Sequence, residues 1–335
     1  MPRSTATVLL QEESSVAAHA AVRAWQNCGH SVPRSIEVLK PEKRKGGVYR
    51  LMGAGAQGLN VIAKKCDTET AAIEHLIYRE VLPQLPLDPL RCYGSLQDDD
   101  ARFSWIFLED AGAGEYSPEI EEHRTLAGLW LGVMNLSARE LPQASRLPDR
   151  GPDSYLEILQ IARCLTREKL VHPGFSAGER EILRQIVSHC ELLETEWRRV
   201  ERFCSKMPRT LVHGDLSLWN ARISENPTQR LLVMDWECAG WGVPAADLAQ
   251  FTGNSLTPDL EAYFSVVHGC WPDLDLHDFE RLANVGRVFR WINAVAWANW
   301  GFHDGAIRWY ITEMGCYRPG IPEWALGTQA LLELE

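Results

Sequence analysis

Two short apolar runs in the middle of the chain each lead to an aspartate, and this ordered pair restricts the fold most strongly. Leu211-Val212 precedes His213-Gly214-Asp215, and Asn220 follows Asp215 by five residues. Leu231-Leu232-Val233-Met234 then leads directly to Asp235. A short apolar run bounded by polar residues is typical of a buried strand. The pattern therefore predicts two strands that present carboxylates at their ends.

The length of the chain indicates more than one hydrophobic core. Its 335 residues exceed the size at which a single core keeps growing. The polar, glycine-containing break Glu109-Asp110-Ala111-Gly112 follows an apolar strand-like segment, and it is the best place for a boundary. We therefore expect an N-terminal part at 1–110 and a C-terminal part at 111–335.

Hydrophobic periodicity changes at this boundary. Before it, strand-like segments dominate and one helical pattern occurs; after it, the pattern is helical apart from the two aspartate-bearing runs. The first part should hold strands at 36–39, 48–52, 59–64 and 103–108 and a helix at 70–81. The second should hold helices at 118–139, 153–168, 179–204 and 278–300. Ser117-Pro118 is a plausible start for the first of these, because proline suits the first helical turn. The expected class is α+β.

Composition excludes several classes of protein. No apolar stretch approaches the length of a membrane span, and the N-terminus does not resemble a signal peptide, so a cytoplasmic protein is expected. Nine scattered cysteines without CxxC spacing predict reduced thiols and no structural zinc site.

The net charge of −11 is unevenly distributed. Residues 1–110 hold 13 Lys and Arg against 14 Asp and Glu, whereas residues 111–335 hold 21 against 31. An acidic chain disfavours nucleic acid as a partner. The acidic second part permits a cationic ligand there, although acidity is also a common route to solubility.

The spacing from His213 to Asn220, followed by Asp235-Trp236-Glu237 and then Pro244 and Asp247-Leu248-Ala249, resembles the aminoglycoside phosphotransferase and choline kinase superfamily. The resemblance runs from Ile36 onward and is strongest over 211–249. It implies a bilobal protein-kinase-like fold, with a small antiparallel sheet in the first lobe and a larger, mainly helical second lobe. It also implies ATP or GTP with Mg²⁺ as cofactors and a small molecule as phosphate acceptor.

The same resemblance gives roles to the motif residues. Asp215 would be the catalytic base, and Asn220 and Asp235 would hold Mg²⁺. An amide and a carboxylate suffice for Mg²⁺, because this ion takes its remaining ligands from phosphate and water. His213 and Asp247 would support the loop that carries Asp215.

Val61-Ile62-Ala63-Lys64 resembles the strand whose lysine binds nucleotide phosphates. Lys65 is adjacent and points to the opposite face, because side chains alternate along a strand. We favour Lys64 and expect Lys65 to face solvent. The partner of Lys64 should be a glutamate on the following helix: the resemblance favours Glu74, whereas periodicity favours Glu80, and we choose Glu74.

Two glycine-containing segments compete for the nucleotide. The segment 53–58 matches GxGxxG, but the β-branched residues after it predict a turn between strands instead of a dinucleotide site. The loop 40–47 is the better candidate, because Gly46 and Gly47 let backbone N–H groups approach phosphate and Lys43, Arg44 and Lys45 add positive charge. A solvated basic loop is an equally good explanation. Glu109 and Ala111 mark the hinge that would contact the base through main-chain groups.

The acceptor is expected to be small. Ser217 stands where protein kinases carry a lysine, and Asp235-Trp236-Glu237 replaces their Asp-Phe-Gly, so a peptide acceptor is disfavoured. Candidate acceptor contacts are Ser217, Glu237, Asp304 and Glu313.

Thirteen tryptophans, several of them after the Asp215 loop, together with carboxylates would suit a cation such as an aminosugar, although core packing is the better explanation for most of these rings. Alternatives are a choline, ethanolamine or other metabolite kinase, and a non-catalytic nucleotide-binding pseudokinase. The oligomeric state is left open.

Overall fold

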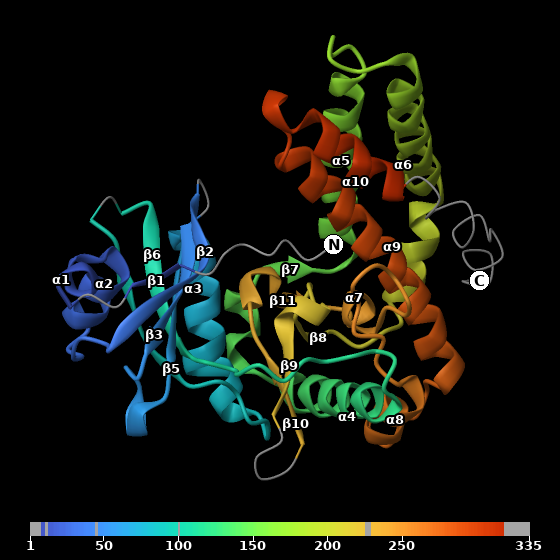
Figure 1. Cartoon of the computed structure of the whole chain (residues 1–335). Coiled ribbons are helices and arrows are strands. Elements are labelled where there is room, and N and C mark those ends of the chain that lie inside the picture. The colour runs from blue at the N-terminus through green and yellow to red at the C-terminus, as the bar shows by residue number, and fades with distance from the viewer. Residues whose placement is uncertain (1–7, 11–12, 44–45, 100, 225–228, 318–335) are drawn as a thin grey trace. The chain divides into compact units, whose positions relative to one another are not determined.

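The computed structural model describes residues 8–10, 13–43, 46–99, 101–224 and 229–317 (Figure 1). The chain forms two compact units, and each is described by itself. Unit 1 consists of Met1–Glu115 and Asn220–Cys238, and unit 2 of Tyr116–Trp219 and Ala239–Glu335. The expected division has a single crossing at 110. In the structure the chain leaves unit 1 after Glu115 and returns to it over 220–238.

Unit 1 is built on a six-stranded antiparallel sheet with the order β1-β2-β3-β4-β6-β5. Its strands are β1 (Val8–Leu10), β2 (Ser35–Lys43), β3 (Gly46–Met52), β4 (Val61–Asp67), β5 (Cys92–Gln97) and β6 (Phe103–Glu109). The four strand segments expected from the sequence correspond to β2, β3, β4 and β6, so that expectation is confirmed. The sequence did not indicate β1 or β5.

One face of this sheet packs on two short N-terminal helices, α1 (Glu13–Ala18) and α2 (Ala20–Asn27), as Figure 1 shows. Trp25 of α2 is fully buried, and its ring lies 5.1 Å from that of Phe107 on β6. Leu51 and Ala63, from β3 and β4, belong to the same core cluster. We did not expect these helices, although Val22 and Trp25 stand at helical spacing in the sequence.

The helix expected at 70–81 is α3 (Thr68–Leu76), followed by a π-helical turn at Ile77–Val81. It packs against β4, β5 and β6 and against the short turn Trp236–Cys238, which ends the returning segment. This contact is one reason why the returning segment groups with unit 1.

The returning segment begins with an antiparallel hairpin of β9 (Ala221–Ser224) and β10 (Arg230–Val233). The N–H of Ile223 donates to the carbonyl of Gly114 at 2.9 Å, which ties the hairpin to the end of the first segment. Val233 pairs with Ala221, so Asn220 and Met234 stand at the open end of the hairpin.

The turn at 53–58 leads directly into β4, not into a helix, as the β-branched residues predict. Gly46, at the start of β3, has a φ of +105°, and a Cβ there would lie 1.8 Å from the carbonyl oxygen of Lys65. Glycine is therefore required at 46 by backbone conformation and by the close approach of β4. Arg44 and Lys45 lie outside the described residues, as does the side chain of Lys43.

Unit 2 is mainly helical and contains a small three-stranded sheet with the order β7-β11-β8. The strands are β7 (Asp149–Arg150), β8 (Thr210–Val212) and β11 (Gly240–Gly242). The helices are α4 (Glu121–Ala138), α5 (Pro152–Lys169), α6 (Ala177–Cys204), α7 (Ala245–Leu248), α8 (Leu260–Val267), α9 (Leu276–Trp300) and α10 (Ile307–Tyr317).

Helices α5, α6, α9 and α10 pack together, and α4 packs on α8 (Figure 1). The buried side chain of Asn135 on α4 fixes β8 to this framework: its Nδ2 donates to the carbonyl of Leu211, and its Oδ1 accepts from the hydroxyl of Tyr263. A buried amide with each group paired is stabilising, whereas the same amide unpaired is costly. Strand β8 is thereby held where it delivers His213.

The expected helices of the second part are present as α4, α5, α6 and α9. The expected start at Ser117-Pro118 is wrong, because α4 begins at Glu121. Instead of entering the helix, the N–H of Ser117 donates to Nδ1 of His123, and Arg124 donates to the carbonyl of Pro118.

Across the described residues, no helix is both long and apolar enough to traverse a bilayer. All nine cysteines are free thiols, as their spacing predicts, and burial raises the pKa of the Cys66 thiol to about 12.

The Trp25 core offers a direct test of the unexpected N-terminal helices. Replacing Trp25 with alanine should lower the free energy of unfolding by about 3–5 kcal/mol, because a fully buried aromatic side chain is lost from the core. Urea unfolding followed by circular dichroism measures the change. Leu59→Ala, at an exposed position, is the control and should change it by less than about 0.5 kcal/mol. Equal losses in both variants would contradict this packing.

Candidate active site

Unit 1 gathers one lysine and three carboxylates at the sheet face that carries α3. The ammonium of Lys64 on β4 lies 3.0 Å from Oε1 of Glu74 and 3.6 Å from Oε2 of Glu237, and it also contacts Oδ1 of Asp235. Of the two glutamates considered for Lys64, it is Glu74 that makes this contact. Glu74 is fully buried.

Burial and neighbouring charges shift the pKa values in this cluster in opposite directions. Burial lowers the pKa of Lys64, but the carboxylates of Glu74, Asp235 and Glu237 outweigh it and hold that pKa well above its ordinary value. Burial raises the pKa of Glu74 to about 7, against the effect of the Lys64 charge. Lys64 therefore remains a cation, and it is the group that makes a buried Glu74 tolerable.

Lys65 points to the opposite face, as strand alternation predicts, but it does not face open solvent. Its ammonium lies 3.1 Å from Oε1 of Glu42 and 2.6 Å from Oδ2 of Asp98, and it lies over the ring of Trp105. The expectation of a solvent-facing Lys65 is wrong, because neighbouring aromatic and acidic side chains cover its aliphatic stem.

Asn220 and Asp235 stand at the open end of the β9–β10 hairpin. The N–H of Met234 donates to the carbonyl of Asn220 at 2.9 Å, which extends the ladder by one step and brings both residues to the same end. Asp235 has a φ of +66°, and such strained backbone costs about 1–3 kcal/mol and is concentrated at functional sites. Amide and carboxylate oxygens are the hard ligands that Mg²⁺ prefers, so these two residues fit that ion.

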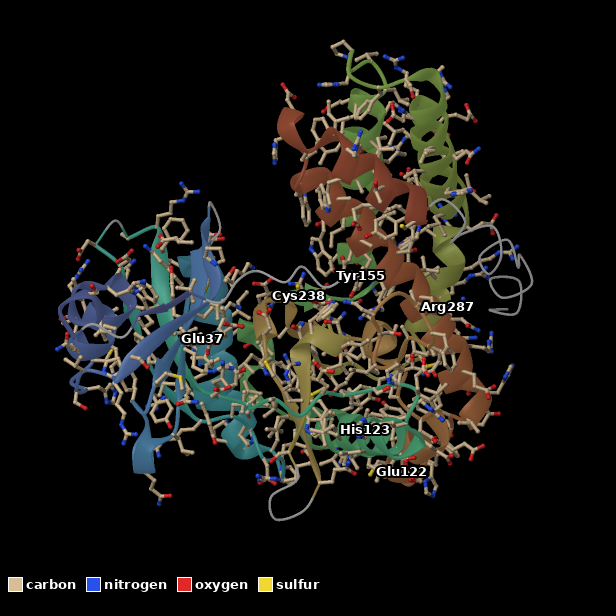
Figure 2. The ribbon with its side chains drawn as sticks, viewed as in Figure 1. Glu37, Glu122, His123, Tyr155, Cys238 and Arg287 are labelled. Atoms are coloured by element: carbon tan, nitrogen blue, oxygen red, sulfur yellow. The ribbon has the colours of Figure 1, made fainter. Side chains whose placement is uncertain are left out.

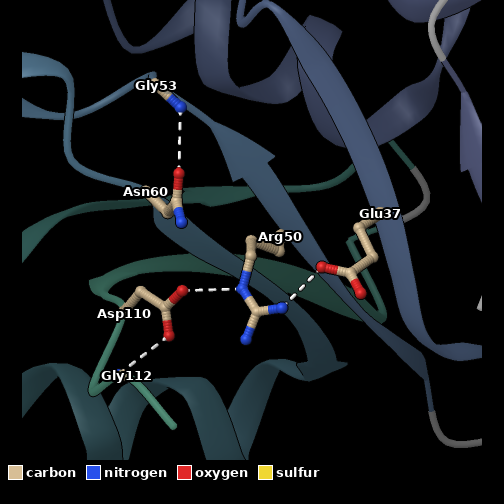
Figure 3. Close-up of polar contacts among 6 residues, drawn as sticks. All are labelled: Glu37, Arg50, Gly53, Asn60, Asp110 and Gly112. Atoms are coloured by element: carbon tan, nitrogen blue, oxygen red, sulfur yellow. Dashed lines mark hydrogen bonds and ion pairs between the residues drawn. The ribbon is translucent and has the colours of Figure 1, made fainter.

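The hinge segment after β6 is tied to the sheet by Arg50 of β3 (Figure 3). The Nε of Arg50 donates to Oδ2 of Asp110 at 2.6 Å, and its Nη1 donates to Oε2 of Glu37 at 2.5 Å. The other oxygen of Asp110 accepts from the N–H of Gly112. The side chain of Asp110 therefore fixes the polar break at 109–112 to the sheet.

The neighbouring hinge residues Glu109 and Ala111 line a cavity of about 360 Å³ together with Leu90 and Leu232. The main chain of Glu109 is also hydrogen-bonded to the residue before β5, because its N–H donates to the carbonyl of Arg91 at 2.8 Å. Gly46 and Gly47 lie in β3 itself, and both are buried.

In unit 2 the carboxylate of Asp247 on α7 holds the backbone before Asp215. It accepts from the N–H of His213 at 2.7 Å and from the N–H of Gly214 at 2.9 Å. Burial raises the pKa of Asp247, and the hydrogen bonds from the two N–H groups and the charge of Arg290 oppose that shift. Gly214 has a φ of +78°, the left-handed conformation that favours glycine.

His213 is fully buried, and its Nδ1 accepts from the N–H of Asp215 at 3.3 Å. The three residues of the motif are thus linked by main-chain hydrogen bonds to Asp247 and to the imidazole ring. Asp215, the acidic residue of this motif, lines a cavity in unit 2.

Arg290 on α9 was not identified from the sequence, and it holds the far side of the same loop. Its Nη1 donates to the carbonyl of Leu216 at 3.2 Å and its Nη2 to Oδ1 of Asn254 at 2.9 Å. Burial lowers the pKa of Arg290, and the charges of Asp215 and Asp247 oppose that shift. A signal was present, because an arginine beside Phe289 and other apolar residues of a buried helix needs a specific partner.

Asp215 lines a cavity of about 650 Å³ that lies within unit 2. Its walls come from the segment 251–254, from α9 and from α10. Among the lining residues are Trp219, Phe251, Arg287, Trp297 and Glu313. This volume is in the range of sites that bind drug-sized ligands.

The predicted acceptor contacts fall in different places. Glu313 lines the cavity, whereas Asp304 is 89% exposed and lies 3.3 Å from Nε2 of His172. Ser217 is buried and pairs with Ser255 through the main chain. Glu237 lies beside Lys64 in unit 1.

The sequence and fold were compared with known proteins. A model of the phosphotransferase enzyme family matches residues 62–269. Among curated proteins no match was found.

Solved structures with the same fold include three informative examples. An APH(2'')-type enzyme in complex with GDP and kanamycin aligns with a TM-score of 0.58 and 13% identity, over 92% of this chain and 97% of that one. A choline kinase from Cryptosporidium parvum aligns with a TM-score of 0.57 and 13% identity, over 89% of this chain and 92% of that one. An ethanolamine kinase from Plasmodium vivax aligns with a TM-score of 0.56 and 14% identity, over 84% of this chain and 82% of that one.

The fold is therefore α+β, bilobal and protein-kinase-like, as the sequence motifs imply. The family match covers more than half of the chain, and this chain belongs to the phosphotransferase enzyme family. It is a phosphotransferase that uses an alcohol group as acceptor.

The bracing of the Asp215 loop can be tested by stability. Asp247→Ala should lower the free energy of unfolding by about 2–5 kcal/mol, because two buried N–H groups lose a charged acceptor. Asp247→Asn should lose less, since its carbonyl still accepts one bond. Urea denaturation measures both, and exposed Glu280→Ala serves as the control. A loss below 1 kcal/mol in Asp247→Ala would contradict the bracing role.

Proposed function

We propose that this protein transfers the γ-phosphoryl group of ATP or GTP to a hydroxyl of a small molecule. The observation that carries the proposal is the placement of Lys64 between buried Glu74 and Asp235. A fixed cation beside a carboxylate at a strained strand end is what phosphoryl transfer requires for the nucleotide phosphates. The solved relatives bound to GDP and to ATP support either nucleotide.

In this proposal Lys64 binds the phosphate oxygens and neutralises negative charge as it develops. Asn220 and Asp235 would hold Mg²⁺, which would supply positive charge to the phosphates. Main-chain groups near Glu109 and Ala111 contact the base, and Gly46 and Gly47 at the start of β3 let their own N–H groups approach the phosphates.

Asp215 orients the acceptor hydroxyl and takes its proton. The hydroxyl oxygen forms a bond to the γ-phosphorus while the bond from that phosphorus to the β–γ bridging oxygen breaks, so the nucleoside diphosphate leaves with the electron pair. His213 and Asp247 keep the loop in place for this step through the hydrogen bonds to the main chain.

The acceptor expected from the charge of residues 111–335 is cationic, either an aminosugar or a choline-like molecule. Aromatic rings and Glu313 in the cavity beside Asp215 support a contact with a positive group. Relatives of both kinds share the fold: one was solved with kanamycin, and two are choline or ethanolamine kinases.

Replacement of the base separates catalysis from binding. Asp215→Asn should reduce ATP consumption by about 10²–10⁴-fold, because the general base is lost, while the Kd for ATP with Mg²⁺ changes less than about threefold. Consumption is measured by ADP release with a panel of amino alcohols, aminosugars, macrolides and neutral glycosides. Calorimetry gives the Kd. A wild-type protein that binds ATP but releases no ADP with any acceptor would instead be a non-catalytic nucleotide-binding module.

The pairing of Lys64 can be tested with two glutamates of neighbouring helical turns. Glu74→Gln should raise the Kd for ATP with Mg²⁺ about tenfold, because a charge-assisted hydrogen bond of about 1.5 kcal/mol that positions Lys64 is weakened. Glu80→Gln should leave the Kd unchanged. Thermal unfolding of both variants verifies folding, and equal effects on the Kd would count against the role of Glu74.

A further inference from the structure

The cavity beside Asp215 differs in charge from the acidic part of the chain that contains it. Of the lining residues that the structure describes, four are charged: Asp215, Glu313, Arg287 and Arg290. Two positive groups balance two negative ones, and one of the negative groups is the proposed base. The −10 balance of residues 111–335 is thus not carried into the cavity.

The two arginines that line the cavity carry permanent positive charge. Arg290 donates hydrogen bonds to the carbonyl of Leu216 and to Asn254, and these bonds hold its guanidinium at the cavity. Arginine keeps its proton in proteins, so its charge is permanent. Arg287 lies one helical turn earlier on α9 (Figure 2), and burial lowers its pKa without removing that charge.

The remaining acid is already engaged. Glu313 on α10 accepts a hydrogen bond from the hydroxyl of Tyr317 at 3.0 Å. A ligand with several ammonium groups would therefore meet two guanidinium groups and would find one partly satisfied carboxylate besides Asp215. Like charges at short range in a partly desolvated site are strongly unfavourable.

The cavity is instead rich in aromatic surface. Trp291 lies in its wall, and the rings of Phe251 and Trp219 are 78% and 68% exposed. Trp297, six residues after Trp291 on α9, is 40% exposed. Soluble proteins rarely gather exposed aromatic rings around one hollow unless that surface binds something.

We propose that the acceptor is a hydroxylated molecule with an apolar ring body and without an array of ammonium groups. Its ring would stack on Trp297, Phe251 and Trp219, while its hydroxyl reaches Asp215. This removes polycationic aminosugars from the expected acceptors, keeps singly charged ring compounds and adds neutral ones, and it rests on the proposed phosphotransferase function.

Three named probes test the inference by calorimetry with the wild-type protein. 4-Nitrophenyl β-glucoside carries hydroxyl groups and a planar ring, methyl β-glucoside carries the same hydroxyl groups without it, and kanamycin is a polycation. We expect the ring glucoside to bind at least about tenfold more tightly than the other two, as expected from ring stacking with aromatic side chains. Equal binding of the two glucosides, tighter binding of kanamycin, or no binding of the ring glucoside would overturn the inference.

Two tryptophans of α9 provide a matched pair of variants. Trp297 lines the cavity, whereas Trp300, three residues later and 48% exposed, is not among the lining residues. Trp297→Ala should weaken binding of the ring glucoside about tenfold, and Trp300→Ala should leave it unchanged. Equal effects of the two substitutions would place the ring elsewhere and overturn the inference.

Nucleotide measurements separate this inference from the function on which it rests. ADP release with kanamycin and not with the ring glucoside, lost in Asp215→Asn, would refute the ring acceptor and retain the phosphotransferase. Failure of the wild-type protein to bind ATP with Mg²⁺ would refute the proposed function itself.

Discussion

The buried carboxylate of Glu74 is the constraint on which the organisation of unit 1 depends. A fully buried charge without a partner is costly, so β4 must bring Lys64 to α3. The same ammonium also contacts the carboxylate of Asp235, which lies about 170 residues away in the sequence. One ion cluster thus connects a strand, a helix and a hairpin end, and it explains why the returning segment 220–238 belongs with the N-terminal sheet.

Unit 2 handles its buried charges in a different way. Asp247 is paired with two main-chain N–H groups instead of a cation, and Arg290 is paired with a main-chain carbonyl and an amide oxygen. Both residues hold the loop that presents Asp215, one from each side of the motif. Bonds to the main chain fix the path of the loop itself, which a contact between side chains would not do.

The cavity beside Asp215 shows why charge summed over a lobe is a weak guide to a ligand. Several acidic residues of 111–335 lie on helices and pair there with arginines, as Glu191 does with Arg167 and Glu194 with Arg163. The lining of the cavity depends on which face of α9 turns inward, and that face carries Arg287 and Arg290 among aromatic rings.

The sequence by itself determined the strands before Asp215 and Asp235, the long helices, the α+β class and the family, because these follow from local periodicity and from motifs of short span. It also identified Lys64 from its strand. It did not predict α1 and α2, because their apolar pattern is short and these helices are stabilised by packing on the sheet. Only the tertiary structure decided that Glu74, and not Glu80, contacts Lys64, that Arg290 braces the Asp215 loop, and which rings surround the cavity. Such contacts join residues far apart in the chain, and no local pattern records which side chains meet when the elements pack.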